Sequence, residues 1–177
     1  MSLPDRRKIL TFALALPLGA SLSACGFEPV YGPNGAGTAL KGQISFQAPQ
    51  TIAAPSDTDA YYLVRQLETR LGRAGAPRYR MDLALKTQEV GQAITADGDI
   101  TRYSLTGTAG YSLVRLSDGQ VVASGEVQNF SGYSASGTTV QTLASETDAH
   151  ERLMVILADQ IVTRLYAVPG LGATTGT

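Results

Sequence analysis

The stretch RYSLTGTAGYSL, residues 102–113, decides the fold. Small or polar residues alternate along it with mainly apolar ones, and this period of two is typical of a β-strand with one buried and one exposed face. Gly107 and Gly110 lie inside the alternation and not between a strand and a helix, which does not fit a dinucleotide-binding loop. The face expected to be buried carries Tyr103, Leu105, Gly107, Ala109, Tyr111 and Leu113.

Similar stretches lie on both sides of this strand. Residues 79–86 and 121–127 alternate in the same way, and Asp-Gly pairs at 97–98 and 118–119 separate the three stretches. Because Asp-Gly favours tight hairpin turns, the three strands are expected to be antiparallel neighbours. A further short strand is predicted at residues 43–47, where apolar and polar residues also alternate.

Two segments change to the helical period. One runs from Ser56 to Leu71 and is followed by Gly72. A longer helix is predicted after the Ser- and Gly-rich residues 131–138, with Ser145 and Asp148 resembling a capping box. The apolar stripes are Ala60, Leu63, Val64, Leu67 and Leu71 in the first helix and Met154, Leu157, Ala158, Ile161 and Leu165 in the second.

The order of the predicted elements is β-α-β-β-β-α. Two helices can cover one face of a sheet. We therefore expect an α+β fold in which two helices pack on one face of a mainly antiparallel four-stranded sheet. The single domain is expected at residues 42–168, preceded by a Pro- and Gly-rich linker and followed by a disordered tail at residues 169–177.

The first 25 residues have the features of a secretory lipoprotein signal. Arg6, Arg7 and Lys8 precede an apolar run that is too short for a permanent membrane span. The run leads to Leu-Ser-Ala-Cys at 22–25, which matches the bacterial lipobox. Residues 1–24 are therefore predicted to be a signal peptide, and residues 25–41 a lipidated N-terminus and linker. Acyl chains on Cys25 would hold the mature chain on a membrane.

Two further features bear on the export and class of the mature chain. The Arg6-Arg7 pair is a feature of twin-arginine export signals, but the residues that flank the pair favour the general secretory pathway. The full sequence has 14 basic and 15 acidic residues. Removal of residues 1–24 takes away three basic residues and one acidic residue, which leaves 11 basic and 14 acidic residues and a net charge of −3. This balance argues against a nucleic-acid partner. Because Cys25 is the only cysteine, a disulfide within the chain or a cysteine zinc site is excluded.

The sequence contains no convincing pattern of reactive groups, and we therefore predict no catalytic residue, metal site or cofactor. His150 is the only histidine, and it is expected to be exposed on the second helix. Arg80, Lys86 and Arg102 occupy strand positions expected to face solvent, where a sheet could gather them to bind phosphate groups.

The opening of the mature chain, CGFEPVYG at residues 25–32, resembles the C-G-F-x-P-[VL]-Y-G opening of the outer-membrane lipopolysaccharide-assembly lipoprotein family, LptE. The resemblance implies a non-enzymatic lipoprotein that plugs a large outer-membrane β-barrel, assists the assembly of that barrel and contacts lipopolysaccharide. It also implies a periplasm-facing location on the outer membrane, which Gly26 after the lipidated cysteine favours. Arg80, Lys86 and Arg102 then become candidates for binding lipid A phosphates.

Two alternatives remain open at this stage. The chain could be a periplasm-facing auxiliary lipoprotein of another envelope transport complex with the same plan of helices and strands. It could also be a lipid-anchored hydrolase, in which case a Ser-His-Asp mechanism would have to use His150.

Overall fold

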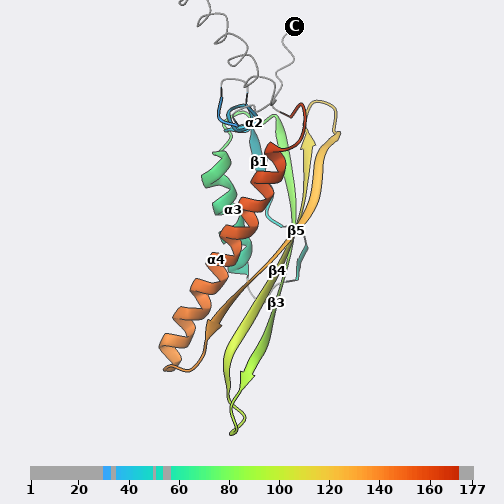
Figure 1. Cartoon of the computed structure of the whole chain (residues 1–177). Coiled ribbons are helices and arrows are strands. Elements are labelled where there is room, and N and C mark those ends of the chain that lie inside the picture. The colour runs from blue at the N-terminus through green and yellow to red at the C-terminus, as the bar shows by residue number, and fades with distance from the viewer. Residues whose placement is uncertain (1–29, 33–34, 50, 54–56, 172–177) are drawn as a thin grey trace, which may run out of the picture.

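A computed structural model describes residues 30–32, 35–49, 51–53 and 57–171 of the chain. The predicted signal peptide and Cys25 lie outside these residues. Figure 1 shows a long, twisted sheet with helices along one side. The elements in chain order are α2 (Ala36–Leu40), β1 (Ile44–Phe46), β2 (Thr51–Ala53), α3 (Asp57–Leu71), β3 (Tyr79–Ile94), β4 (Ile100–Arg115), β5 (Val121–Ser134) and α4 (Thr139–Tyr166).

The sheet has five strands, and two of them, β1 and β2, are short and share one edge. Its order is β1-β3-β4-β5, and the short strand β2 also pairs with β3. β1 pairs in parallel with Tyr79–Met81 and β2 with Ala84–Lys86, so the two short strands follow one another along the same edge of β3. β3, β4 and β5 are antiparallel neighbours. The predicted α+β fold is confirmed, and β2 is an addition that the sequence pattern did not predict.

Both predicted Asp-Gly turns are present. Gly98 has a φ of 91° and Gly119 a φ of 70°, and this left-handed region favours glycine. The strand β3 is longer than predicted, because it continues beyond residue 86 to Ile94 before the first turn. The hairpin of β3 and β4 consequently extends past the N-terminal end of α3 in Figure 1.

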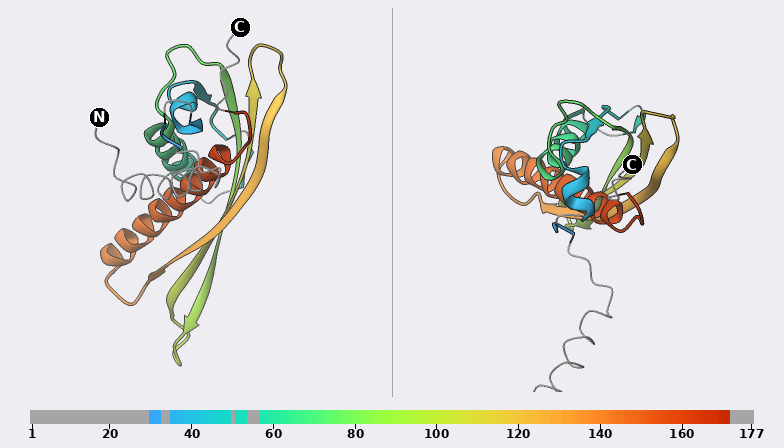
Figure 2. Two further views of the ribbon diagram at one scale, coloured as in Figure 1. Left: turned by 45° about the horizontal axis from the view of Figure 1, so that its top comes forward. Right: turned by 90° about the horizontal axis from the view of Figure 1, so that it is seen from above.

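α3 and α4 lie on the same face of the sheet (Figure 2). The stripe predicted for the second helix is fully buried, as are Leu63, Leu67 and Leu71 of α3. Leu105, Ala109 and Leu113 face them from β4, as the alternation predicted. A Cβ atom built on Gly107 would lie 2.9 Å from Leu153 Cδ2, so the absence of a side chain there lets α4 approach the sheet.

α4 begins earlier than predicted. The hydroxyl of Thr138 accepts a hydrogen bond from the Gln141 amide, and the Gln141 side chain accepts one from the Thr138 amide, which forms the capping box. The box predicted at Ser145 and Asp148 is wrong, because the Ser145 hydroxyl donates to the Gln141 carbonyl within the helix. The first turns of α4 lack an apolar stripe since they extend beyond the core, and Val140 there is 78% exposed.

The two ends of the domain are also more structured than predicted. Residues 36–40, assigned to the linker, form α2, and Leu40 is fully buried. Leu171, assigned to the disordered tail, packs into the hydrophobic core. Residues 172–177 lie outside the described ranges. Within those ranges, no helix combines the length and hydropathy that a membrane span requires.

Candidate functional surfaces

The face of the sheet opposite the helices is one candidate surface. Along β4 it presents the half-exposed residues of the alternation, which are small or polar: Ser104, Thr106, Thr108, Gly110 and Ser112. Phe130 of β5 pairs with Thr106 and is 72% exposed. An exposed aromatic ring on a broad polar face is typical of surfaces that contact another macromolecule. We call this surface the outer sheet face.

The three predicted basic residues all lie on the outer sheet face. Arg80 stands opposite Val114, Lys86 opposite Thr108, and Arg102 opposite Ala93. At a rise of about 3.3 Å per residue, roughly 20 Å of strand separates each from the next. The register therefore spreads them along the face and does not bring them into one cluster.

The basic residues also differ in their partners. The Arg80 guanidinium donates to both oxygens of Asp82, at 2.8 and 3.1 Å. Neither Lys86 nor Arg102 forms an ion pair within the described part of the chain. Lys86 and Arg102 are therefore more available to an anionic ligand than Arg80.

A second candidate surface surrounds His150, which the sequence analysis placed in solvent. That prediction is wrong, because His150 is only 9% exposed. The sequence did contain the signal: His150 lies four residues before Met154 and seven before Leu157, on the buried stripe of α4. Because His150 is polar, has charged neighbours in the sequence and lies near the end of the core, it was predicted to be a surface residue.

A buried carboxylate holds the His150 ring. Asp59 of α3 is fully buried, and its Oδ1 lies 2.7 Å from His150 Nδ1. The Thr87 hydroxyl on β3 donates to the other carboxylate oxygen at 3.2 Å. This network joins α3, α4 and β3. The hydrogen bond to Asp59 is the main cause that raises the pKa of His150 above its usual value, while burial opposes the shift.

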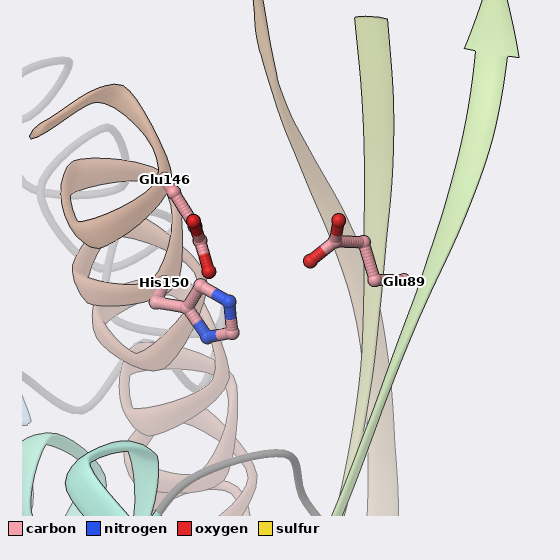
Figure 3. Close-up of side chains that lie close together, drawn as sticks. All are labelled: Glu89, Glu146 and His150. Carbon is pink, nitrogen blue, oxygen red and sulfur yellow. The ribbon is translucent and has the colours of Figure 1, made fainter. Parts of the chain in front are cut away.

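Two glutamates approach the same ring from the open end of the domain (Figure 3). Glu146 lies one turn before His150 on α4, and Glu89 faces it from β3. One potential ligand atom from each of these three side chains lies within 4.8 Å of the other two. We call Glu89, Glu146 and His150 the Glu-Glu-His cluster.

The Glu-Glu-His cluster borders an open cleft. The Tyr133 hydroxyl donates to Glu89 at 2.8 Å, and the Tyr133 ring stacks on Tyr103 with the centroids 5.2 Å apart. Burial, and then the bond to Glu89, raises the pKa of Tyr133. Glu89, Tyr133 and Glu146 lie on the wall of the cleft, which has a volume of about 730 Å³.

Asp59 and His150 are arranged like the Asp-His pair of a hydrolase triad, but no nucleophile completes the arrangement within the described residues. Nδ1 is occupied by Asp59, and within the described residues no serine, threonine or cysteine hydrogen-bonds to Nε2. The side chains in front of the ring are carboxylates. The arrangement therefore lacks the nucleophile that the hydrolase alternative needs.

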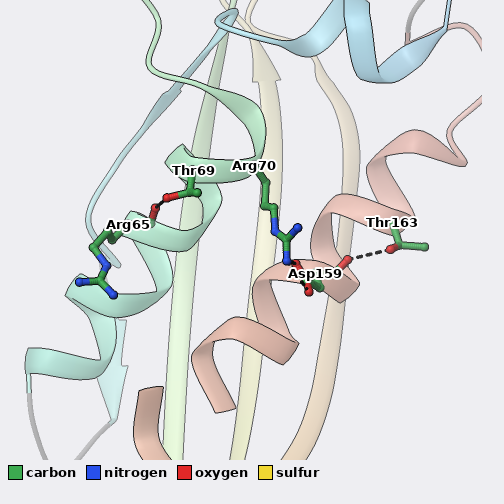
Figure 4. A network of polar contacts seen from close by, with 5 residues as sticks. All are labelled: Arg65, Thr69, Arg70, Asp159 and Thr163. Atoms are coloured by element: carbon green, nitrogen blue, oxygen red, sulfur yellow. Dashed lines mark hydrogen bonds and ion pairs between the residues drawn. The ribbon is translucent and has the colours of Figure 1, made fainter. Parts of the chain in front are cut away.

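Exposed ion pairs fasten α3 to α4 on the side away from the sheet. Arg70 donates to Asp159 at 2.9 Å, as Figure 4 shows, and Arg65 donates to Glu151 at 2.5 Å. The hydroxyls of Thr69 and Thr163 donate to main-chain carbonyls within their own helices. Because the paired side chains are exposed, each pair contributes at most about 1 kcal/mol, and their main effect is on helix orientation.

The family model for lipopolysaccharide assembly, LptE, matches residues 43–165, which include β1, both long helices and the three long strands. The chain belongs to the LptE family. The family resemblance predicted from the opening residues is thus confirmed by a match that begins after them. The family is described by its role in lipopolysaccharide assembly.

Solved structures share the fold of this LptE-family chain. A candidate lipoprotein from Caulobacter crescentus CB15 is 21% identical with a TM-score of 0.61, covering 78% of this chain and 97% of that one. Uncharacterised lipoprotein B from Nitrosomonas europaea is 15% identical with a TM-score of 0.53, covering 83% and 94%. The rare lipoprotein B from Shewanella oneidensis is 12% identical with a TM-score of 0.51, covering 66% and 92%. No curated protein sequence matches the chain.

Proposed function

We propose that this LptE-family chain is an outer-membrane lipoprotein, anchored by lipid on Cys25 and facing the periplasm. In this proposal it partners and plugs the β-barrel of the lipopolysaccharide translocon, assists the assembly of that barrel and helps to deliver lipopolysaccharide to the cell surface. The match of the LptE model over residues 43–165 is the observation that carries the proposal.

The outer sheet face supports the plugging part of the proposal. The lumen of a large outer-membrane barrel is lined with polar residues. A protein that fills such a lumen needs a polar surface with few large apolar patches. Small and hydroxyl-bearing residues cover the centre of β4, which matches this requirement, and Phe130 supplies an aromatic contact. We infer that the outer sheet face contacts the barrel wall.

Co-purification tests the barrel partner. In detergent extracts the wild-type chain is expected to purify with a barrel-sized membrane protein. Phe130→Glu should reduce the recovered barrel by about tenfold or more, because a buried aromatic anchor commonly contributes at least 2 kcal/mol to an interface. Val140→Glu is the matched control, since Val140 is equally apolar and 78% exposed but lies on the first turns of α4.

Two results would contradict the barrel proposal. The absence of any barrel-sized partner with the wild-type chain would remove the plug altogether and favour an auxiliary role in another envelope complex. Equal recovery of the barrel with Phe130→Glu and wild type would remove the outer sheet face as the contact surface.

Binding of lipopolysaccharide to the purified chain tests the role of the basic residues. Lys86→Glu and Arg102→Glu are each expected to weaken binding several-fold, because a charge-assisted contact to phosphate is replaced by repulsion. Arg80→Glu should have a smaller effect, since Arg80 already pairs with Asp82. Arg73→Glu, on the loop after α3, is the control. Unchanged affinity in the Lys86 and Arg102 variants would show that lipopolysaccharide binds elsewhere.

A further inference from the structure

The Glu-Glu-His cluster and the neighbouring Asp59 together carry more negative charge than the nearby basic groups balance. Three carboxylates, from Asp59, Glu89 and Glu146, surround the single imidazole of His150. None of the ion pairs among the described residues includes Glu89 or Glu146. A positive charge bound at this position would relieve the imbalance.

The buried histidine supplies an independent indication of a ligand. The side chain of His150 is 11% exposed, and its Nδ1 is committed to Asp59. No hydrogen bond reaches Nε2 from the described residues, and the ring faces Glu89 and Glu146 in Figure 3. A carboxylate on one imidazole nitrogen is the arrangement that orients a histidine for metal binding through the other nitrogen.

We propose that Glu89, Glu146 and His150 bind one divalent transition-metal ion, with zinc as the best match to the donor set. Nε2 of His150 and one oxygen of each glutamate are the three protein ligands. The cleft leaves the fourth position open to water or to a ligand oxygen. Imidazole as a ligand favours zinc and similar ions over calcium or magnesium, which prefer oxygen ligands alone.

Binding of the ion requires the three side chains to close around it. Ligand atoms up to 4.8 Å apart must approach by about 1 Å or more, because bonds of about 2.0–2.2 Å place neighbouring ligands of a tetrahedral zinc ion roughly 3.4 Å apart. His150 is fixed by Asp59, but Glu89 is only half-buried, on the wall of the cleft. A rotation of the Glu89 side chain, which would exchange its bond to Tyr133 for a bond to the ion, closes the site.

The bound ion would link the strand β3 to α4, where the sheet and the helix separate toward the open end of the domain. Through Asp59 it would also be coupled to α3. The open coordination position faces the cleft, so the ion could accept an oxygen of an anionic ligand there. This site lies on the helix side of the sheet and is separate from the outer sheet face.

Zinc titration of the mature chain tests the proposal. The chain is purified in detergent without a polyhistidine tag, stripped with a chelator and titrated with Zn²⁺ by calorimetry. We expect saturable binding of one ion per chain and a higher melting temperature in zinc. Asp59→Asn should weaken zinc binding by about tenfold to a hundredfold, as for other residues that orient a metal ligand. Glu89→Gln and Glu146→Gln should weaken it at least as much.

Matched controls separate the site from general metal binding. Glu126→Gln removes an exposed carboxylate on β5 and is expected to bind zinc like the wild type. Glu89 and Glu146 lie outside the hydrophobic core, so their variants should keep the wild-type circular dichroism spectrum. The proposal is overturned if the wild-type chain shows no saturable site, or if the Glu89 and Glu146 variants retain full affinity.

Discussion

Asp59→Ala is expected to lower the free energy of unfolding by about 3–5 kcal/mol, the cost of removing one partner from a buried charged pair. Asp59 is fully buried, and its two oxygens satisfy His150 Nδ1 and the Thr87 hydroxyl. Alanine leaves both groups without their partner inside the domain and creates a cavity between α3, α4 and β3. Chemical denaturation followed by circular dichroism measures the loss.

A matched aspartate shows why burial decides this result. Asp82 also makes a short contact to a basic side chain, 2.8 Å to Arg80, but its side chain is 35% exposed. Asp82→Ala should therefore cost about 1 kcal/mol or less. Equal losses for the two variants would mean that the network around Asp59 adds nothing to the stability of the fold.

Much of the fold can be predicted from residue patterns that span only a few neighbouring positions. The alternation around Leu105 and Ala109 predicts a half-buried strand, because strand side chains point to opposite faces in turn. The helical spacing of the apolar residues from Met154 to Leu165 predicts the buried stripe of α4 in the same way. The Asp-Gly pairs at 97–98 and 118–119 predict the two turns, since a residue with positive φ is needed there.

The elements that escaped prediction depend on contacts distant in sequence. The strand β2 has three residues, too few to show a period, and it forms because the edge of β3 is free beyond β1. The first turns of α4 extend beyond the core and therefore have no apolar stripe. The cap at Thr138 could have been recognised, because Gln141 three residues later completes a capping box.

The candidate surfaces also combine features that a local sequence pattern predicts with features that depend on contacts distant in sequence. Strand alternation was enough to place Arg80, Lys86 and Arg102 on one face. Their spacing along that face depends on strand register, which a single sequence does not determine. The Glu-Glu-His cluster was missed because Glu89 and Glu146 are 57 positions apart in the numbering and meet only after β3 packs beside α4.

Cys25→Ser is expected to abolish lipid attachment completely. One acyl chain gives only marginal membrane binding, with an association constant of about 10⁴ M⁻¹, so lasting attachment depends on the two or three chains that a lipobox cysteine receives. Cys25 is the only cysteine, and no other thiol can accept the lipid in its place. Labelling of cells with a palmitate analogue should give a strong signal on the wild-type chain and none on the variant.

The processing of the variant provides the second readout. Because the lipobox is read together with its lipid, the serine variant should accumulate as a precursor that keeps residues 1–24, which the mass of the purified chain reveals. Ser23→Ala keeps a small residue in the lipobox and should be labelled and cleaved like the wild type. Label on the Cys25→Ser chain would contradict the anchor. Cleavage of that chain between residues 24 and 25 without label would instead indicate an ordinary secretory signal, and the outer-membrane attachment would then have to come from the barrel alone.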